Sequence, residues 1–192
     1  MKRILSDFRE NTTASEKAEI TQKIFDKVIS LSEYKKASLV FAYIPDILEA
    51  DCMPVIKDAL LKGKKVCVPK VDFESMKTGE NKMDFYLLDS SKSIDEQLKT
   101  GAYGIREPKS ELQKVREKAV QKESAPFMIV PGVAFTQSGK RLGHGKGFYD
   151  IYIQRLKKSG IKPFLCAIAL KCQITDDLPA EEHDILMDTV IF

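Results

Sequence analysis

Apolar residues follow two spacings along this chain, one typical of helices and one of buried strands. After Thr13, with Glu16 three residues later as in a capping box, apolar residues recur at helical spacing and predict a long N-terminal helix, with a stripe of Ile20, Ile24, Val28 and Leu31. Short apolar runs closed by proline, glycine or polar turns predict buried strands at Leu39–Ile44, Lys65–Val71, Met83–Leu88, Phe127–Val130 and Pro163–Leu170, with a short last strand at Thr189–Phe192.

Further helices are predicted between these strands, from about Met53 to Lys62 and from Phe148 to about Lys158. Strands that alternate with helices through short connections favour an α/β fold with a mostly parallel sheet. We therefore expect one α/β domain that spans residues 1–192, a length compatible with a single core.

Composition excludes several classes of protein. A net charge of +3, with lysine and arginine spread along the chain, argues against a nucleic-acid partner. No apolar run reaches the roughly eighteen residues of a membrane span, and no signal peptide follows Met1. Four cysteines without a CxxC pair and two histidines argue against a zinc site. We expect a cytoplasmic protein in a reduced environment.

A basic, glycine-rich loop lies between the predicted strand at 127–130 and the predicted helix at 148–158. Its glycines alternate with cationic side chains and a histidine, as Gly139, Lys140, Arg141, Gly143, His144, Gly145, Lys146 and Gly147. Glycine lets the backbone approach a ligand closely, and a helix N-terminus attracts anions. These features together predict a phosphate cradle, with a nucleotide as its ligand.

The loop matches neither of two common nucleotide-binding motifs. Gly147 follows Lys146 where a Walker A motif requires serine or threonine, and the Gly-x-Gly-x-Gly spacing differs from a dinucleotide fingerprint. A flexible, solvated basic turn is the alternative interpretation. Asp150 favours the phosphate site, because a carboxylate there would suit magnesium, although it would also suit the helix dipole.

Two segments around this loop resemble the 5-formyltetrahydrofolate cyclo-ligase family (methenyltetrahydrofolate synthetases). They are Val-Pro-Gly-Val-Ala-Phe from Val130 and Gly-Lys-Arg-Leu-Gly-His-Gly-Lys-Gly-Phe-Tyr-Asp from Gly139. Four more motifs of the family occur elsewhere in the chain, in the same order as in the family. They are Lys2-Arg3-x-Leu5, Glu49-Ala-Asp51, Tyr103-Gly-Ile-x-Glu107-Pro108 and Leu178-Pro-x-Glu-x-His-Asp184. So many motifs in one order argue against a chance match.

The resemblance implies both a fold and an activity. The fold is a three-layer α/β/α sandwich with a mostly parallel sheet, of the kind seen in sugar-phosphate isomerases and coenzyme A transferases. The activity is the ATP- and Mg²⁺-dependent cyclisation of 5-formyltetrahydrofolate to 5,10-methenyltetrahydrofolate, through phosphorylation of the formyl oxygen and with release of ADP and phosphate. The expected partner is this reduced folate, and we expect a monomer without nucleic-acid or membrane partners.

The resemblance also implies residue roles. ATP would be bound by Lys2, Arg3, Arg141, Leu142, Gly143, His144, Gly145, Lys146, Gly147, Phe148 and Tyr149. The folate would be bound by Ile44, Glu49, Tyr103, Glu107, His144, Gly145, Lys146, Gly147 and Phe148. Magnesium would be held by Asp150 and Asp184, and the catalytic residues would be Lys146, Arg141 and Tyr149.

The sequence departs from the family pattern at two positions. Ser6 stands where the family usually has an arginine, and Arg9 is the nearest replacement. Phe148 replaces a common tyrosine, so a phenol in the loop must come from Tyr149. Two other classes therefore stay as alternatives: a sugar-phosphate isomerase or acyl-transfer enzyme of the same fold, and a folate- or nucleotide-binding protein without catalysis.

Overall fold

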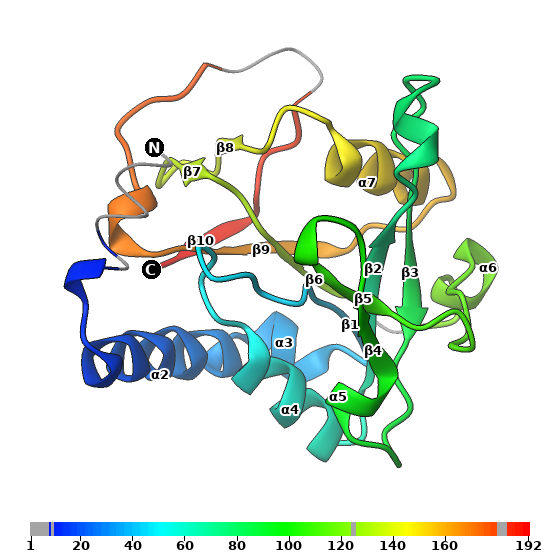
Figure 1. Cartoon of the computed structure of the whole chain (residues 1–192), viewed down its shortest axis with the longest axis horizontal. Helices are drawn as coiled ribbons and strands as arrows, with labels where there is room; N and C mark the ends of the chain where they lie inside the picture. The colour runs from blue at the N-terminus through cyan, green and yellow to red at the C-terminus, as the bar shows by residue number, and fades with distance from the viewer. Residues whose placement is uncertain (1–7, 9, 124–125, 180–183) are drawn as a thin grey trace.

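A computed structural model of the chain describes residues 8, 10–123, 126–179 and 184–192, and the structural statements below concern these residues. A six-stranded sheet crosses the centre of the protein, with its strands in the order β10-β9-β6-β1-β2-β3 (Figure 1). Neighbouring strands are parallel, except that β3 runs antiparallel to β2. The strands are β1 (Leu39–Phe41), β2 (Lys65–Val71), β3 (Met83–Leu87), β6 (Phe127–Val130), β9 (Phe164–Ile168) and β10 (Thr189–Ile191).

The middle strands are parallel because their sequences are apolar on both faces. β1 and β6 are buried at every residue, and β9 is buried at all but its first. Such runs need helices on both sides of the sheet, which short antiparallel hairpins would not provide. The predicted α/β fold with a mostly parallel sheet is confirmed.

Helices cover the two faces of the sheet and form two hydrophobic clusters. On one face, α2 (Ala14–Ser30), α3 (Ser32–Lys36) and α4 (Met53–Leu61) pack on residues such as Val40 and Phe127 (Figure 1). On the other face, α7 (Phe148–Lys158) packs on Phe41 and Met128. Alternate residues of each strand therefore enter opposite clusters, which gives the three layers.

Helix α7 is fixed over the edge of the sheet by side chains from the middle of the helix. The ring of Tyr152 packs against Phe41 and Phe85, with centroids 6.0 and 4.7 Å apart. Arg155 donates from Nη2 to Oδ1 of Asp84 on β3, at 2.7 Å. The direction of α7, and with it the place of its N-terminus, is set by these contacts.

The structure differs from the predicted elements in small features. β1 ends at Phe41 rather than Ile44, although Ala42 still donates its amide to the Cys67 carbonyl at 3.0 Å. Two hairpins were not predicted, β4 (Leu98–Thr100) with β5 (Arg106–Pro108), and β7 (Ala134–Phe135) with β8 (Arg141–Leu142). Their strands have two or three residues, too few for an alternating pattern to be read.

The remaining helices are single turns, and none of the helices described is long and apolar enough to cross a membrane. The short α-helices are α5 (Ile94–Gln97) and α6 (Glu117–Val120), and the 3₁₀ turns are η1 (Glu74–Met76), η2 (Ala102–Gly104) and η3 (Lys171–Gln173).

Lys64 ties the end of α3 to the start of β2. Its ammonium donates to three main-chain carbonyls, those of Tyr34 at 2.9 Å, Lys35 at 3.1 Å and Ala37 at 2.6 Å. It also lies 5.1 Å from the centre of the Tyr34 ring. Carbonyls at a helix C-terminus have no partner within the helix, so this lysine supplies one.

We therefore expect Lys64→Met to lower the free energy of unfolding by about 1–3 kcal/mol, because charged hydrogen bonds to partly buried carbonyls are lost. Lys23→Met serves as the control, since Lys23 makes only an exposed i,i+4 pair with Glu19 and should cost less than about 0.5 kcal/mol. Urea unfolding followed by circular dichroism measures both. Equal stability of the two variants would contradict a structural role for Lys64.

Candidate functional site

A cleft of about 690 Å³ opens at the carboxyl ends of the parallel strands. Tyr43 and Ile44 follow β1, Pro69 and Val71 lie in the last part of β2, and Pro131 follows β6, and all of them line the cleft. The carboxyl edge of an open parallel sheet is where ligands usually bind in α/β folds. The glycine loop forms another wall, since every residue from Arg141 to Ile151 lines the same cleft.

The loop runs from the β7–β8 hairpin to the N-terminus of α7. Gly145 and Gly147 have φ angles of +75° and +65°, values at which a residue with a side chain would be strained. Gly147 is the N-cap of α7, and no side chain caps the helix there. The first backbone N–H groups of α7 lie at the edge of the cleft and are therefore not engaged by a capping side chain. An anion site requires such N–H groups.

Lys146 and His144 are exposed at the tip of this loop, and Lys146 makes no ion pair within the part of the chain that the structure describes. Lys140, at the other end of the loop, is paired with Asp177 at 2.6 Å and does not line the cleft. Lys146 is thus the loop lysine whose charge is available to a ligand.

Arg141 is engaged inside the protein. Its Nη2 lies 2.5 Å from Oδ2 of Asp150, and the side chains are only 7% and 17% exposed. Nη1 donates to the Pro131 carbonyl at 3.3 Å, while Nε is buried and finds no hydrogen-bond partner in the described part of the chain. Arg141 therefore holds the loop to the first turn of α7, besides lining the cleft.

Tyr149 presents a buried hydroxyl that has no hydrogen-bond partner among the residues that the structure describes. Its ring lies 6.0 Å from the guanidinium of Arg141 and packs edge-on against Phe85 at 6.3 Å. Burial raises the pKa of Tyr149, and the nearby Glu49 carboxylate adds to the effect. The phenol stays protonated at neutral pH and can donate to an oxygen that enters the cleft.

Glu49 lies in the segment after β1, which also lines the cleft. Its Oε2 accepts the amide of Asp46 at 3.0 Å, while Tyr43 donates its hydroxyl to the Ala50 carbonyl at 2.5 Å. Burial raises the pKa of Glu49 to about 7, with the Asp46 carboxylate adding to it and the hydrogen bond opposing it. Ile44 lies beside it on the cleft wall.

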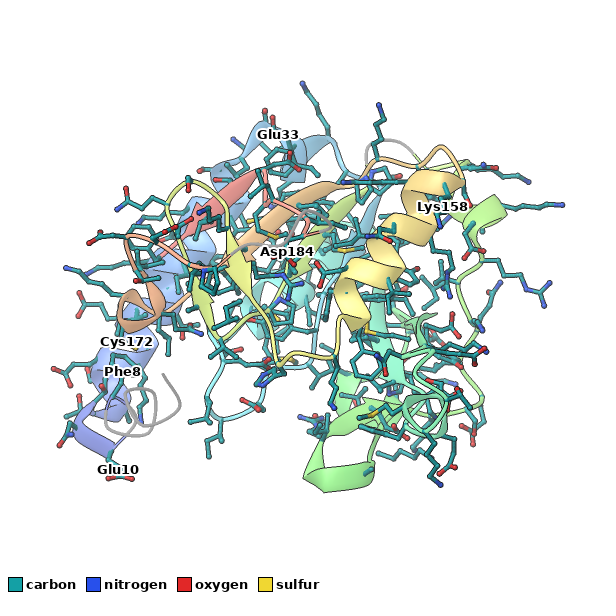
Figure 2. The ribbon with its side chains drawn as sticks, turned by 90° about the horizontal axis from the view of Figure 1, so that it is seen from above. Phe8, Glu10, Glu33, Lys158, Cys172 and Asp184 are labelled. Carbon is teal, nitrogen blue, oxygen red and sulfur yellow. The ribbon has the colours of Figure 1, made fainter. Side chains whose placement is uncertain are left out.

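The β4–β5 hairpin supplies the remaining predicted folate residues. Glu107 on β5 lines the cleft together with Ile105 and Arg106, and Tyr103 lies in the η2 turn that joins the two strands. Asp184 also lines the cleft, and Figure 2 places it between the β7–β8 hairpin and α7. Lys2, Arg3, Ser6 and Arg9 lie outside the described residues. The structure thus brings to one cleft the predicted site residues whose side chains it describes.

An apolar wall of this cleft was not predicted. It is formed by side chains from β2, the turn after it, β3 and the η2 turn, namely Pro69, Val71, Phe73, Met83 and Ile105. Phe73 was the available signal, because it is an aromatic residue within an otherwise polar turn. A smaller cavity of about 400 Å³ beside α2 shares Asp46 and Glu49 with the cleft but contains none of the glycine loop.

The two carboxylates predicted to hold magnesium, Asp150 and Asp184, are brought to the same cleft. Within the described ranges, no group of three or more His, Cys, Asp and Glu side chains could hold a metal by itself. Mg²⁺ usually takes one or two carboxylates and completes its shell with phosphate and water oxygens. The pair therefore fits a magnesium ion that arrives with a nucleotide.

Comparisons with known proteins agree on one family. The sequence model described as the 5-formyltetrahydrofolate cyclo-ligase family matches residues 1–192. The mouse protein named 5-formyltetrahydrofolate cyclo-ligase is 32% identical over 181 residues, which is 94% of this chain and 85% of that protein.

Two solved structures are similar over nearly the whole chain. The Aquifex aeolicus 5,10-methenyltetrahydrofolate synthetase superposes with a TM-score of 0.73 at 33% identity, covering 99% of this chain and 86% of the other. The Mycoplasma pneumoniae 5,10-methenyltetrahydrofolate synthetase has a TM-score of 0.69 at 22% identity, covering 99% and 94%, and at that identity it supports the fold alone.

The raised pKa of Glu49 predicts a pH dependence of stability. Between its ordinary pKa of 4.5 and about 7, the native state keeps a proton that the unfolded state has lost, so the free energy of unfolding falls as pH rises. Glu49→Gln removes this fall. From about pH 5 to about pH 8, the variant should gain roughly 2 kcal/mol relative to the original protein.

Chemical unfolding at the two pH values measures this change. Glu19→Gln is the matched control, because the Glu19 side chain is 65% exposed and should show no such gain. If Glu49→Gln and Glu19→Gln respond alike to pH, the Glu49 carboxyl is not perturbed.

Proposed function

The chain belongs to the 5-formyltetrahydrofolate cyclo-ligase family, and we propose that it catalyses the ATP- and Mg²⁺-dependent conversion of 5-formyltetrahydrofolate to 5,10-methenyltetrahydrofolate. ADP and phosphate are the other products. The observation that carries this proposal is that one cleft joins the glycine loop, with Lys146 at its tip, to the carboxyl groups of Glu49 and Glu107. A phosphate donor and an organic acceptor have room to meet there.

Two parts of the cleft lining suit two different ligands. The glycine loop offers an available lysine and the amide end of α7, which favour a triphosphate. The rest of the lining offers apolar side chains, among them Phe73 and Met83, and the carboxyl groups of Glu49 and Glu107. A flat heterocycle with N–H donors, such as the pterin of a reduced folate, matches this part.

The chemistry begins with the formyl oxygen, which is a weak nucleophile. In the proposed reaction this oxygen attacks the γ-phosphorus of ATP, the bond to ADP breaks, and an iminium phosphate forms. The arylamine nitrogen of the folate then attacks the former formyl carbon and loses its proton. Phosphate departs with the former formyl oxygen, which completes the methenyl bridge.

This reaction asks the protein mainly for positioning and for neutralisation of charge. Lys146 and the loop amides would hold the transferring phosphoryl group, and the Tyr149 hydroxyl would donate to an oxygen of the reacting groups. Arg141 would keep the loop in place through Asp150. Magnesium, held by Asp150 and Asp184, would supply further charge neutralisation on the phosphates. Lys2 and Arg3 stay predicted ATP contacts.

The same features weigh against the alternative classes. A phosphosugar offers no flat apolar surface for a wall that contains Phe73, Met83 and Ile105. A protein that only binds folate would not need an uncapped helix N-terminus and an available lysine in the same cleft. A cytoplasmic location and a monomeric state stay predictions from the sequence.

A direct assay tests the proposed activity. Purified protein is mixed with 5-formyltetrahydrofolate, MgCl₂ and ATP, and the methenyl-folate absorbance band is followed. The expected result is a rise that requires ATP and is matched by ADP formation. A flat trace with a protein that binds the folate would favour the binding-protein class, and a flat trace without binding would contradict the proposal altogether.

Replacing Lys146 tests the phosphate role of the loop. Lys146→Ala should lower kcat by about a hundredfold, because a charge that stabilises the transferring phosphoryl group is lost. Its thermal midpoint should not change, since the side chain is exposed. Lys140→Ala is the matched control from the same loop, because Lys140 faces Asp177 instead of the cleft and should keep its turnover. Similar kcat values for both variants would contradict the role of Lys146.

Replacing Asp184 tests the magnesium role. Asp184→Asn should raise the Mg²⁺ concentration needed for half-maximal turnover by about tenfold, because one of two anionic oxygen ligands is lost. Calorimetry of ATP binding at several Mg²⁺ concentrations should show the same shift without turnover. An unchanged Mg²⁺ dependence in both measurements would rule out Asp184 as a ligand.

A further inference from the structure

The Glu107 carboxylate is held between two lysines from different strands. Its Oε1 lies 3.4 Å from Nζ of Lys70 on β2 and 3.5 Å from Nζ of Lys99, its cross-strand partner on β4. The Glu107 side chain is 14% exposed and that of Lys70 is 25% exposed, while Lys99 is 48% exposed. Lys70 is the more enclosed of the two cations, and it is anchored in the central sheet.

Lys70 is directed to Glu107 although another carboxylate is nearby. Its cross-strand partner on β3 is Asp84, and the two oxygens of Asp84 are already paired with Arg155 at 2.7 Å and Lys114 at 2.5 Å. The contact therefore joins the central sheet to the β4–β5 hairpin.

Gly101 leaves the space that the Glu107 carboxyl group occupies. A Cβ added at Gly101 would lie 2.6 Å from Cδ and 2.8 Å from Oε2 of Glu107, closer than real contacts allow. The φ angle of Gly101 is −96°, which alanine can adopt, so the glycine is required by the packing of Glu107 and not by its own backbone. The Gly101 amide also donates to the Ile105 carbonyl at 2.7 Å, which closes the turn.

We infer that Lys70 and Gly101 are positioning residues that orient the Glu107 carboxylate toward the reduced folate. This inference rests on the proposed function, because it assigns the folate to the cleft that Glu107 lines. Lys70 fixes one oxygen through charge, and Gly101 gives the group room on its other side. A carboxylate held in this way accepts a hydrogen bond from a ligand N–H without first losing side-chain freedom.

Calorimetric titration with 5-formyltetrahydrofolate tests the inference without turnover. Lys70→Met and Gly101→Ala should each weaken folate binding by about tenfold, the size expected when one charge-assisted hydrogen bond is misaligned. ATP binding should not change, and in the steady state the KM for folate should rise more than kcat falls. Lys70→Arg should recover most of the affinity, because it restores a cation opposite Oε1.

Lys77→Met is the matched control. Lys77 is a 74% exposed lysine paired with Glu74 in the η1 turn, and its loss should leave folate affinity unchanged. Thermal midpoints of all the variants separate a local effect from a loss of folding. A lower folate affinity in Lys70→Met that is matched by the control, or that is not recovered by Lys70→Arg, would overturn the inference.

Two further arms show whether Lys70 acts through Glu107. In a Glu107→Gln background, Lys70→Met should have almost no additional effect, since the carboxylate it orients is gone. With 5-formyltetrahydropteroate, which lacks the glutamyl carboxylates, Lys70→Met should still weaken binding about tenfold. If the effect disappears with this ligand, Lys70 binds the glutamyl group directly and the inference is wrong. If the original protein binds no folate at all, the proposed function fails along with it.

Discussion

The buried ion pair of Arg141 and Asp150 determines the shape of the glycine loop. Arg141 is the first residue of β8 and Asp150 lies in the first turn of α7, so the pair closes the segment between them. Because the guanidinium is almost fully buried, the loss of either partner would leave an uncompensated charge, which is strongly destabilising. The loop can adopt this closed course because Gly145 and Gly147 accept positive φ angles. The loop therefore has its closed course before any ligand binds, as preorganised electrostatic stabilisation of a bound phosphate would require.

The rest of the fold brings other groups to face this loop. The contact of Arg155 with Asp84 and the packing of Tyr152 fix the direction of α7. The parallel strands end at one edge, so the segment after β1 brings Glu49 to the same cleft as the loop. The same enclosure raises the pKa values of Glu49 and Tyr149, because both groups lose contact with water there. Perturbed groups that gather in one cleft are typical of a functional site.

The sequence predicted those parts of the structure that local patterns encode. The apolar runs of β1, β6 and β9 identified the central sheet, and the glycine loop was recognised from its spacing and charge.

Contacts between distant segments leave no such pattern. The pair of Lys70 and Glu107 joins residues that lie far apart in the sequence, on β2 and β5, and it depends on a hairpin of three-residue strands. Asp150 was predicted only as a metal ligand or a helix-start charge, whereas the structure shows it also holding Arg141. Phe73 was treated as part of a polar turn, although its side chain lines the cleft.

In the reaction that we propose, a nucleotide phosphate and a folate formyl group react with each other in this one cleft. Isotope transfer tests it most directly: 5-formyltetrahydrofolate labelled with ¹⁸O in the formyl group is converted with MgATP, and the released phosphate is examined by mass spectrometry. We expect the label to appear in phosphate, in an amount equal to the methenyl product formed. Methenyl product with unlabelled phosphate would mean that the formyl oxygen is never phosphorylated, and the proposed reaction would be wrong.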